Sequence, residues 1–428
     1  MNYRETVNYL YECTPVFEHV GASAYKEGLD NTHALDKHFG HPHQHYKIIH
    51  IAGTNGKGSC SHTLAAILQA MGYNVGLYTS PHLVDFRERI RVNGEMIPEE
   101  YVVDFVDKEK NFFTPLHPSF FELTTAMAFK CFAEKHVDYA VVEVGLGGRL
   151  DCTNIVTPIL SIITNISKDH TQFLGETLPQ IAAEKAGIIK PNTPVVIGEA
   201  IPETRHVFEH KAIETHSKII FAEDACEVVQ VDKSQGVGIS YQTVNYGVVT
   251  GALIGEYQIK NTNTVLCAIR ELGITDVEAV KKGFLNVVQL TGLMGRWQIL
   301  CNQPLIVCDT GHNVGGWKYL SKQIIHQECH QKHIVFGMVD DKDIDSVMEL
   351  LPKDAIYYWS QATTHRAIPS QVVAQKGLAH GLVGRVYDSV ESAYMAALAI
   401  AVPNDFVFIG GSSYIVSDLL ACLATPKE

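Results

Sequence analysis

A lysine set among alternating glycines, in the run from Gly53 to Ser59, is the clearest chemical feature of the sequence. An apolar run over residues 48–52 precedes it, and a helix-like run over residues 60–71 follows. A buried strand that opens through glycines into a helix exposes backbone N–H groups, where the helix dipole favours negative charge. Lys57 would bring a full positive charge to a β- or γ-phosphate, and Ser59 would bring a hydroxyl to a phosphate or its metal. The pattern therefore predicts phosphate binding.

The loop departs from the usual phosphate-loop pattern, which has a glycine six positions before the lysine and Ser or Thr directly after it. Ile51 and Gly58 hold those two places here. The alternative interpretation is a glycine-rich turn between a strand and a helix, with Lys57 facing water. The loop alone does not decide between the two.

Three further polar residues accompany apolar runs that are typical of strands. Ser80 follows one run, Glu143 interrupts another and His170 follows a third. In open parallel sheets, ligands collect at the carboxyl ends of the strands. Hydroxyl, carboxylate and imidazole groups beside a phosphate loop suit magnesium that bridges nucleotide phosphates.

Each of these residues also has a structural interpretation. Ser80 is expected to cap a strand end in that case, and His170 to cap a helix. Glu143 would form a salt bridge, with Arg149 as a candidate partner, because a buried glutamate is costly unless it is paired, protonated or bound to a cation. Taken together with the loop, the three residues favour a metal and phosphate site.

Lys185 lies in a run of small and apolar residues, 181–187, which reads as a helix. Its local company is Glu184, so one interpretation is a surface pair of neighbouring charges.

Two groups of histidines are candidate metal ligands. His41, His43 and His45 lie in a proline-broken segment before the first strand, and His326, His330 and His333 follow at near-helical spacing. Neither group has the carboxylates or thiolates of a dedicated transition-metal site. The expected role of both is a solvated loop or helix face.

Composition bounds the class of protein. The chain has 428 residues, 46% of them hydrophobic and 19% charged, with a net charge of −13. This balance is normal for a folded protein of two or three domains and argues against a surface for nucleic acid or anionic membranes. Ten cysteines without a Cys-x-x-Cys pair, and an N-terminus without a signal-peptide pattern, lead us to expect a cytoplasmic protein.

Strand and helix patterns alternate along the chain, which predicts a parallel sheet covered on both faces. A glycine-broken linker at residues 291–296 predicts domains at 1–293 and 294–428. The expected fold class is α/β, with a P-loop-type, mostly parallel N-terminal ATPase domain and a smaller Rossmann-like C-terminal domain. Strands of the second series are expected at residues 305–308, 334–337, 355–359, 385–387 and 405–409.

Nine ordered motifs together resemble folylpolyglutamate synthase and dihydrofolate synthase, a branch of the Mur ligase superfamily. They keep the family order and span most of the chain. The matching segments are Ile51–Ser59, Thr79–Leu83, Glu88–Gly94, Glu143–Asn154, Asp169–His170, Ala183–Ile188, Gly255–Asn261, Gly295–Arg296 and Asp309–Asn313.

The resemblance implies an ATP-dependent amide ligase that acts as a monomer on small-molecule substrates. A dihydropteroate or folate carboxylate attacks the γ-phosphate of ATP, and the amine of L-glutamate then displaces phosphate from the acyl phosphate. Lysine, metal ions and a helix N-terminus would screen the two anions from each other before phosphoryl transfer.

The resemblance also assigns residues. It implies Lys57, Lys185 and His170 as catalytic residues, and Lys185 as the lysine that family members carry as a carbamate. Nucleotide contacts are implied for Gly56, Lys57, Gly58, Ser59, Asn261, Arg296, Asp309 and His312. Magnesium ligands are implied at Ser80, Glu143, His170 and Lys185. The pterin is expected near Glu27, Gly28, Leu29, Phe121, Glu122, Thr124, Leu150, Asp151 and Cys152.

Two departures from the family pattern fall in loops. Met294 stands where proline is common before Gly-Arg, and Thr310-Gly311 replaces Gly-Ala before His312. Two other functions remain as alternatives. One is a Mur-type ligase that joins an amino acid to a UDP-sugar peptide, and the other is a nucleotide-binding protein without ligase activity.

Overall fold

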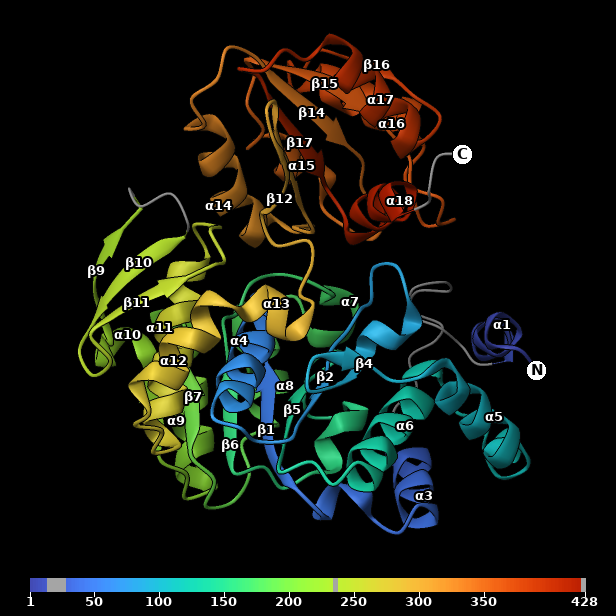
Figure 1. Cartoon of the computed structure of the whole chain (residues 1–428), viewed down its shortest axis with the longest axis vertical. Coiled ribbons are helices and arrows are strands. Elements are labelled where there is room, and N and C mark those ends of the chain that lie inside the picture. Colours follow the sequence, from blue (N-terminus) through green and yellow to red (C-terminus); the bar gives the residue numbers. More distant parts are fainter. Residues whose placement is uncertain (14–27, 234–237, 425–428) are drawn as a thin grey trace. The chain divides into compact units, whose positions relative to one another are not determined.

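The structure is a computed structural model that describes residues 1–13, 28–233 and 238–424. The chain divides into two compact units (Figure 1). Unit 1 comprises residues 1–252 and 258–293, and unit 2 comprises residues 253–257 and 294–428. The short segment 253–257 therefore belongs to unit 2 although both its neighbours in sequence belong to unit 1.

Unit 1 is built on a mostly parallel sheet with the strand order β4-β3-β2-β5-β1-β6-β7-β8. The strands from β2 to β8 in that order are parallel, and β3 and β4 are antiparallel at one edge. Their bounds are β1 Lys47–Ala52, β2 Val75–Tyr78, β3 Ile90–Val92, β4 Glu95–Met96, β5 Tyr139–Glu143, β6 Leu160–Ile163, β7 Val195–Ile197 and β8 Ile219–Phe221.

Helices cover both faces of this sheet, as the alternating pattern predicted (Figure 1). The longer helices are α1 Tyr3–Cys13, α3 Asp30–His38, α4 Lys57–Ala70, α5 Glu99–Phe113, α6 Phe120–Glu134, α8 Leu178–Ala186, α9 Pro202–Glu214, α11 Gln258–Glu271 and α12 Val277–Leu285. Short turns of helix are η2 Pro42–Gln44, η3 Phe86–Arg89, η4 Thr114–Leu116, η5 Cys152–Ile155, α7 Thr171–Leu174, α10 Ala222–Ala225 and α13 Val287–Thr291. A separate antiparallel sheet joins β9 Val228–Asp232, β10 Ile239–Thr243 and β11 Val248–Gly251.

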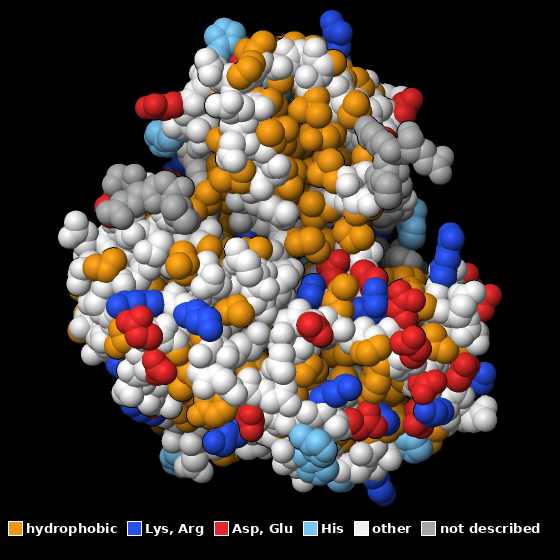
Figure 2. Space-filling model, viewed as in Figure 1, with side chains coloured by type: hydrophobic (Ala, Val, Ile, Leu, Met, Phe, Trp, Pro, Cys, Tyr) orange, Lys and Arg blue, Asp and Glu red, His pale blue; other side chains and the backbone are white. Residues whose placement is uncertain are grey.

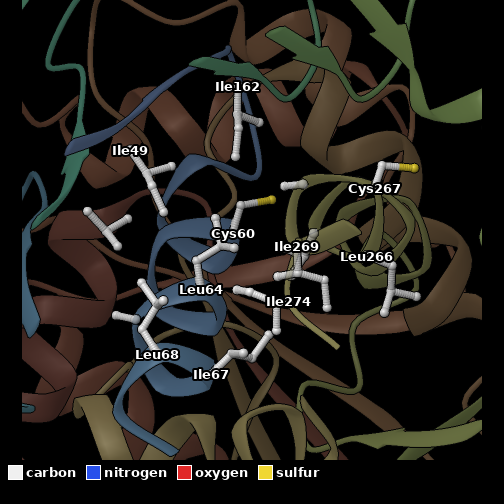
Figure 3. Packing of buried hydrophobic residues seen from close by; sticks show 14 of the residues in the cluster. Ile49, Cys60, Leu64, Ile67, Leu68, Ile162, Leu266, Cys267, Ile269 and Ile274 are labelled. Carbon is white, nitrogen blue, oxygen red and sulfur yellow. The ribbon is translucent and has the colours of Figure 1, made fainter. Parts of the chain in front are cut away.

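Alternate residues of the central strand β1 pack into different cores. Ile48 belongs to a cluster with residues of α6, whereas Ile49 and Ile51 belong to a cluster with residues of α4 and α11. Figure 3 shows this second cluster, which includes Ile49 of β1, Leu64 and Leu68 of α4 and Ile269 of α11. Because side chains alternate across a strand, an unbroken apolar run requires a covering layer on each face.

Unit 2 contains a second sheet in the order β12-β13-β17-β14-β15-β16, in which β12 alone of these strands is antiparallel. The strands are β12 Gln298–Asn302, β13 Leu305–Asp309, β14 Lys332–Phe336, β15 Ala355–Trp359, β16 Gly384–Val386 and β17 Phe406–Gly410. The helices are α14 Val314–Ile325, α15 Ile344–Met348, α16 Ser370–Ala379, α17 Val390–Ile400 and α18 Ser413–Ala424. The predicted parallel strands match within two residues, and β12 was not predicted because it is a half-exposed edge strand.

Some histidines of each group lie against a carboxylate. The Nδ1 atoms of His41 and His43 lie 2.6 and 2.7 Å from the Asp36 carboxylate. His333 is buried in β14, not on a helix face, and its Nε2 lies 3.2 Å from Asp405, which also bonds His330. The prediction of a solvated face is therefore wrong for His333. Within residues 1–13, 28–233 and 238–424, no cluster of three or more His, Cys, Asp or Glu side chains is arranged to hold a metal.

The surface of unit 1 carries basic and acidic side chains interspersed with one another on the face seen in Figure 2. Such mixing is typical of a solvated surface. No helix in the described part of the chain is long and apolar enough to cross a membrane.

Candidate active site

The carboxyl ends of the central strands bring the predicted site residues to one edge of the unit 1 sheet. In the parallel pair β1–β5, Ile51 is aligned with Glu143, and Tyr78 of β2 is aligned with Val142. Ser80 follows β2 by two residues, and the glycine loop follows β1 directly. The prediction that these strand ends meet is therefore confirmed by the register.

The glycine loop turns from β1 into α4 at Gly56, which has a φ of 85° at the helix N-cap. Lys57 folds back over the loop, where its Nζ donates to the carbonyl oxygens of Gly53 and Thr54 at 3.1 and 3.2 Å. The same Nζ lies 4.0 Å from the Glu143 carboxylate. Lys57 therefore faces the strand ends, not bulk water, which removes the interpretation as a solvent-facing lysine.

A second loop, which follows β6, is bonded to the glycine loop. The Asn165 side chain accepts from the Asn55 N–H at 2.9 Å, and the Asn165 carbonyl accepts from the Thr54 N–H at 3.0 Å. Asn165 also donates to Glu199 at 3.2 Å. No role for Asn165 was indicated by the sequence pattern, although its position just after an apolar strand was a usable signal. Asn165 thus holds the backbone of the glycine loop at Thr54 and Asn55.

Glu143 is buried at the end of β5, with 4% of its surface exposed. The alternative interpretation, a salt bridge between Glu143 and Arg149, does not hold, because Arg149 instead pairs with Glu184 at 3.0 Å. Glu184, the partner expected for a surface-facing Lys185, is therefore already paired with Arg149. Glu143 thus leaves its carboxylate beside Lys57, inside the site.

Lys185 is buried, with 4% of its surface exposed, although it carries a long cationic side chain. Burial lowers the pKa of Lys185 to about 7, and the positive charge of Lys57 acts in the same direction. Asp169 and Asp151 oppose the shift. The surface-pair interpretation of Lys185 is therefore wrong: α8 turns this residue inward, toward the same charges that surround the glycine loop.

His170 is the N-cap of α7, with a φ of 50°, and its side chain does not cap the helix. Its Nε2 lies 3.8 Å from Asp169. A left-handed conformation is uncommon for a residue with a side chain and is found most often at turns and functional sites. The imidazole is thus held at a turn that follows the β6 loop.

A buried polar chain crosses from the middle of β1 to the loop after β5. The Nε2 of His50 lies 2.8 Å from the Thr153 hydroxyl, which itself donates to the Asp151 carboxylate. Asp151 also accepts from the backbone N–H groups of Thr153 and Leu146 at 3.0 and 2.8 Å. Because the Thr153 hydroxyl donates its hydrogen bond to Asp151, it can only accept from His50. His50 therefore donates through Nε2–H to the Thr153 oxygen. Sequence analysis did not single out His50.

Burial lowers the pKa of His50 to about 3, with the nearby Lys190 charge as a second cause. The unfolded chain binds a proton on His50 near pH 6.5, whereas the folded chain does not. The free energy of unfolding should therefore decrease as the pH is lowered from about 6.5 to about 3, by up to about 1.4 kcal/mol per pH unit. Urea unfolding between about pH 5 and 7 measures this slope. His50→Gln should flatten it, whereas His210→Gln, at an exposed position, should not. An equal slope in both variants would contradict the assignment.

The residues expected near the pterin are partly assembled. Phe121 packs its ring over Gly145, where an added Cβ would come within 2.5 Å of the ring, and it stacks on Tyr78. Glu122 is buried and accepts from the Ser119 N–H at 2.6 Å in a helix capping box, while Asn31 of α3 approaches it at 3.5 Å. Glu122 therefore has a structural partner in addition to any ligand.

The other pterin residues differ in position. The hydroxyl of Thr124 is buried and donates to the Phe120 carbonyl at 2.7 Å, within its own helix. Cys152 lies near Asp151 and Glu122, and burial raises the pKa of its thiol. Leu150 is half-buried on the same loop. Gly28 and Leu29 lead into α3, and Glu27 lies outside the described residues.

Within unit 2, the predicted nucleotide residues form one cluster. Asp309 is buried at the end of β13 and accepts from the Tyr257 hydroxyl at 2.6 Å, the Trp297 N–H at 2.6 Å and the Gly311 N–H at 2.8 Å. Burial raises the pKa of Asp309. Arg296 donates to Thr310, and His312 Nδ1 lies 3.0 Å from the Thr310 carbonyl. The replacement of Gly-Ala by Thr310-Gly311 thus supplies a hydroxyl that Arg296 uses.

Asn261 lies in the first turn of α11, directly against the glycine loop. A Cβ added at Gly56 would come within 2.3 Å of the Asn261 Oδ1. The neighbouring Gln258 donates to the Ser59 hydroxyl at 3.0 Å. The family resemblance implied a nucleotide contact for Asn261 but indicated no role for Gln258.

A parallel sheet with a glycine loop at its carboxyl edge, joined to a second α/β unit, defines the class as a P-loop-type nucleotide-binding protein with two α/β units. Residues 51–269 match the model of the Mur ligase middle domain, and residues 295–413 match that of the Mur ligase, glutamate ligase domain. A dihydrofolate synthase/folylpolyglutamate synthase of Bacillus subtilis is 31% identical over 412 residues, which cover 92% of this chain and 94% of that protein.

Solved structures agree with these matches. One, of Escherichia coli FolC in complex with DHPP and ADP, is similar with a TM-score of 0.85 and 28% identity, over 99% of this chain and 98% of that one. A bifunctional folylpolyglutamate synthase/dihydrofolate synthase of Yersinia pestis, complexed with AMPPNP and Mn ion, has a TM-score of 0.82 and 28% identity, over 99% and 98%.

The chain therefore belongs to the Mur ligase family, in its folylpolyglutamate synthase/dihydrofolate synthase branch. It spans about half the length of one relative, a probable bifunctional folylpolyglutamate synthase/dihydropteroate synthase of Haloferax volcanii, which is 31% identical and of which 50% is covered.

Proposed function

We propose that this chain is an ATP-dependent, ADP-forming ligase that adds L-glutamate to dihydropteroate, to a folate or tetrahydrofolate, or to both. The observation that carries the proposal is the meeting of the glycine loop, Lys57 and Glu143 at one sheet edge, in a chain of this family. The relatives support the substrate class by their names and by the DHPP, ADP and AMPPNP in the solved structures.

The proposed reaction has two steps. A carboxylate oxygen of the pterin substrate attacks the γ-phosphorus of ATP, and the bond from that phosphorus to the bridging oxygen breaks, releasing ADP. The glutamate amine then attacks the acyl carbon of the acyl phosphate, loses a proton and expels phosphate. Lys57 and the loop N–H groups stabilise the negative charge that moves among the phosphate oxygens.

Nucleotide binding is proposed for Gly56, Gly58, Ser59 and Asn261 in unit 1 and for Arg296, Asp309 and His312 in unit 2. The pterin is proposed to contact the residues around Phe121 and Asp151, with Glu27, Gly28, Leu29, Glu122, Thr124, Leu150 and Cys152 as the other predicted contacts. The domain boundary between residues 293 and 294 and a monomeric state remain predictions.

The donor set fits a hard divalent cation. Ser80 offers a hydroxyl, Glu143 a buried carboxylate and His170 an imidazole, and a buried carboxylate near phosphates is a typical magnesium ligand. These residues would hold Mg²⁺, which supplies charge neutralisation for the phosphate oxygens. His170 would act through that position, and the Asp169 carboxylate lies 3.8 Å from its Nε2.

We further propose that Lys185 carries a carbamate, which converts a buried cation into an anion that holds a second magnesium. Its burial among Lys57, Asp169 and Asp151 supports this, because a neutral amine is the form that reacts with carbon dioxide. Intact mass measured in bicarbonate buffer should show one added CO₂, absent from Lys185→Ala. The same increment in the alanine variant, or none in the parent protein, would refute the carbamate.

ADP release tests the function as a whole. Purified protein, ATP, Mg²⁺ and L-glutamate would be incubated with dihydropteroate and, separately, with tetrahydrofolate. We expect ADP formation to depend on the pterin. When glutamate is omitted, ADP formation should stop after the first turnover. If neither pterin stimulates ADP release, the folate-ligase proposal fails. Stimulation by a UDP-sugar peptide instead would support the Mur-type alternative.

A further inference from the structure

Gln258 touches the phosphate loop from a distant part of the chain. It is the first residue of α11 and is buried, with 2% of its surface exposed. Its Nε2 donates to the Ser59 hydroxyl at 3.0 Å, and its Oε1 accepts from the Asn261 Nδ2 at 2.9 Å. The second bond sets the direction of the Gln258 amide, because its oxygen must face Asn261 and its nitrogen must face Ser59.

The first turn of α11 holds this arrangement closely. The side-chain oxygen of Asn261 lies where a Cβ on Gly56 would be, and the backbone carbonyl of Asn261 accepts a weak bond from the Cys60 thiol at 3.9 Å. Ser59 itself is buried, with 1% of its surface exposed. Gln258, Asn261 and the loop residues 56–60 thus form one packed unit with little freedom to rearrange.

The bond polarity has a chemical consequence for Ser59. A serine hydroxyl has one proton to donate and two lone pairs that accept. Because Gln258 can only donate through its nitrogen, it occupies a lone pair and leaves the Ser59 proton for another acceptor. Phosphate oxygens at neutral pH are strong acceptors, and a hydrogen bond to a charged group is about twice as strong as a neutral one.

We propose that Gln258 is a positioning residue that commits the Ser59 hydroxyl to donate its proton to a phosphate oxygen of the bound nucleotide. The inference rests on the proposed function and adds the residue that sets the polarity of one loop contact. Gln258 acts through Ser59 and does not itself touch the phosphates.

Two substitutions separate polarity from packing. Gln258→Met keeps the length of the side chain but removes the donor, so Ser59 becomes free to rotate. Gln258→Glu keeps the shape but replaces the donor by a carboxylate. The carboxylate would accept a hydrogen bond from the Ser59 hydroxyl, so the direction of the bond would be reversed. We therefore expect the affinity for ADP with Mg²⁺ to fall only a few-fold in the methionine variant and by at least about 10-fold in the glutamate variant.

Calorimetric titration of the full chain with ADP and Mg²⁺ tests the proposal without turnover. The decisive measurement is a double-mutant cycle with Ser59→Ala. If Gln258 acts through Ser59, the methionine change should have no further effect on ADP affinity once Ser59 is alanine. An equal loss from Gln258→Met in both backgrounds, or equal affinities for the Gln258→Met and Gln258→Glu proteins, would overturn the inference.

Two controls complete the design. Gln242→Glu places the same new charge on an exposed position of β10 and should leave ADP affinity unchanged. Relative to the parent protein, ADP binding by Gln258→Glu should recover as pH is lowered, because a protonated carboxyl regains a donor; no recovery would count against the polarity argument. Absence of ADP binding by the parent protein would instead refute the proposed nucleotide site and not the role of Gln258.

Discussion

Replacing Lys57 with alanine is expected to lower the rate of ADP formation by about 10³-fold while the melting temperature stays near that of the parent protein. The Lys57 ammonium donates to two loop carbonyls and lies 4.0 Å from the Glu143 carboxylate. In the nucleotide-bound protein its charge would move from these oxygens to the phosphates, where charge builds up as the γ-phosphoryl group leaves. Without Lys57, less positive charge would offset the repulsion between the γ-phosphate and the attacking carboxylate.

The fold should tolerate this change because the bonds made by Lys57 are to two carbonyls of its own loop. The β1–α4 packing is carried by apolar residues, among them Ile49, Ile51 and Leu64. Lys47→Ala, an exposed position at the start of the same strand, serves as the matched control and should keep full activity. Turnover of Lys57→Ala within about 10-fold of the parent would mean that the loop is not the phosphate site.

Replacing Glu143 with glutamine is expected to lower ADP formation by about 10²-fold or more and to raise the Mg²⁺ concentration needed for half-maximal rate. The amide has the same shape but no charge, and it is a poorer ligand for a hard divalent cation. Stability should hold or increase, because a buried carboxylate with 4% exposure loses its desolvation cost when it becomes neutral.

This opposite movement of activity and stability distinguishes a metal ligand from a structural ion pair. If Glu143 served mainly to hold Lys57 in place, the glutamine variant would melt at a lower temperature and its Mg²⁺ requirement would not change. Steady-state rates over a Mg²⁺ titration, together with thermal unfolding, decide between the two. Glu278→Gln, which changes a strongly exposed carboxylate on α12, provides the comparison for a surface charge.

Local patterns predicted the fold well because they follow from short-range rules. An apolar run such as residues 48–52, followed directly by glycines and then by a helical period, is sufficient to define a buried strand, a turn and a helix. The parallel strands of unit 2 fall within two residues of their expected positions. The edge strand β12 was not predicted because a half-exposed strand has no clear apolar period.

Two of the alternative interpretations failed for one reason, which is that each side chain's partner was chosen from its sequence neighbours. Arg149 follows Glu143 closely in sequence but pairs with Glu184. Lys185 follows Glu184 directly, yet it lies four residues after the buried Ile181 and so on the buried face of α8. The helical period was a usable signal for Lys185, but the presence of a charge outweighed it.

The sequence by itself determined the alternation of strands and helices, the family resemblance and the loop that offers N–H groups and a lysine to phosphates. The strands, the helices and the loop depend on residue order over spans of a few to about twenty residues, and the resemblance depends on the order of nine such motifs. Tertiary structure alone decided which groups meet: Ser59 and Gln258 are separated by 199 residues, and His50 and Thr153 by 103. Hydrogen bonds at such separations depend on strand order and helix packing, because these bring distant side chains within about 3 Å of each other.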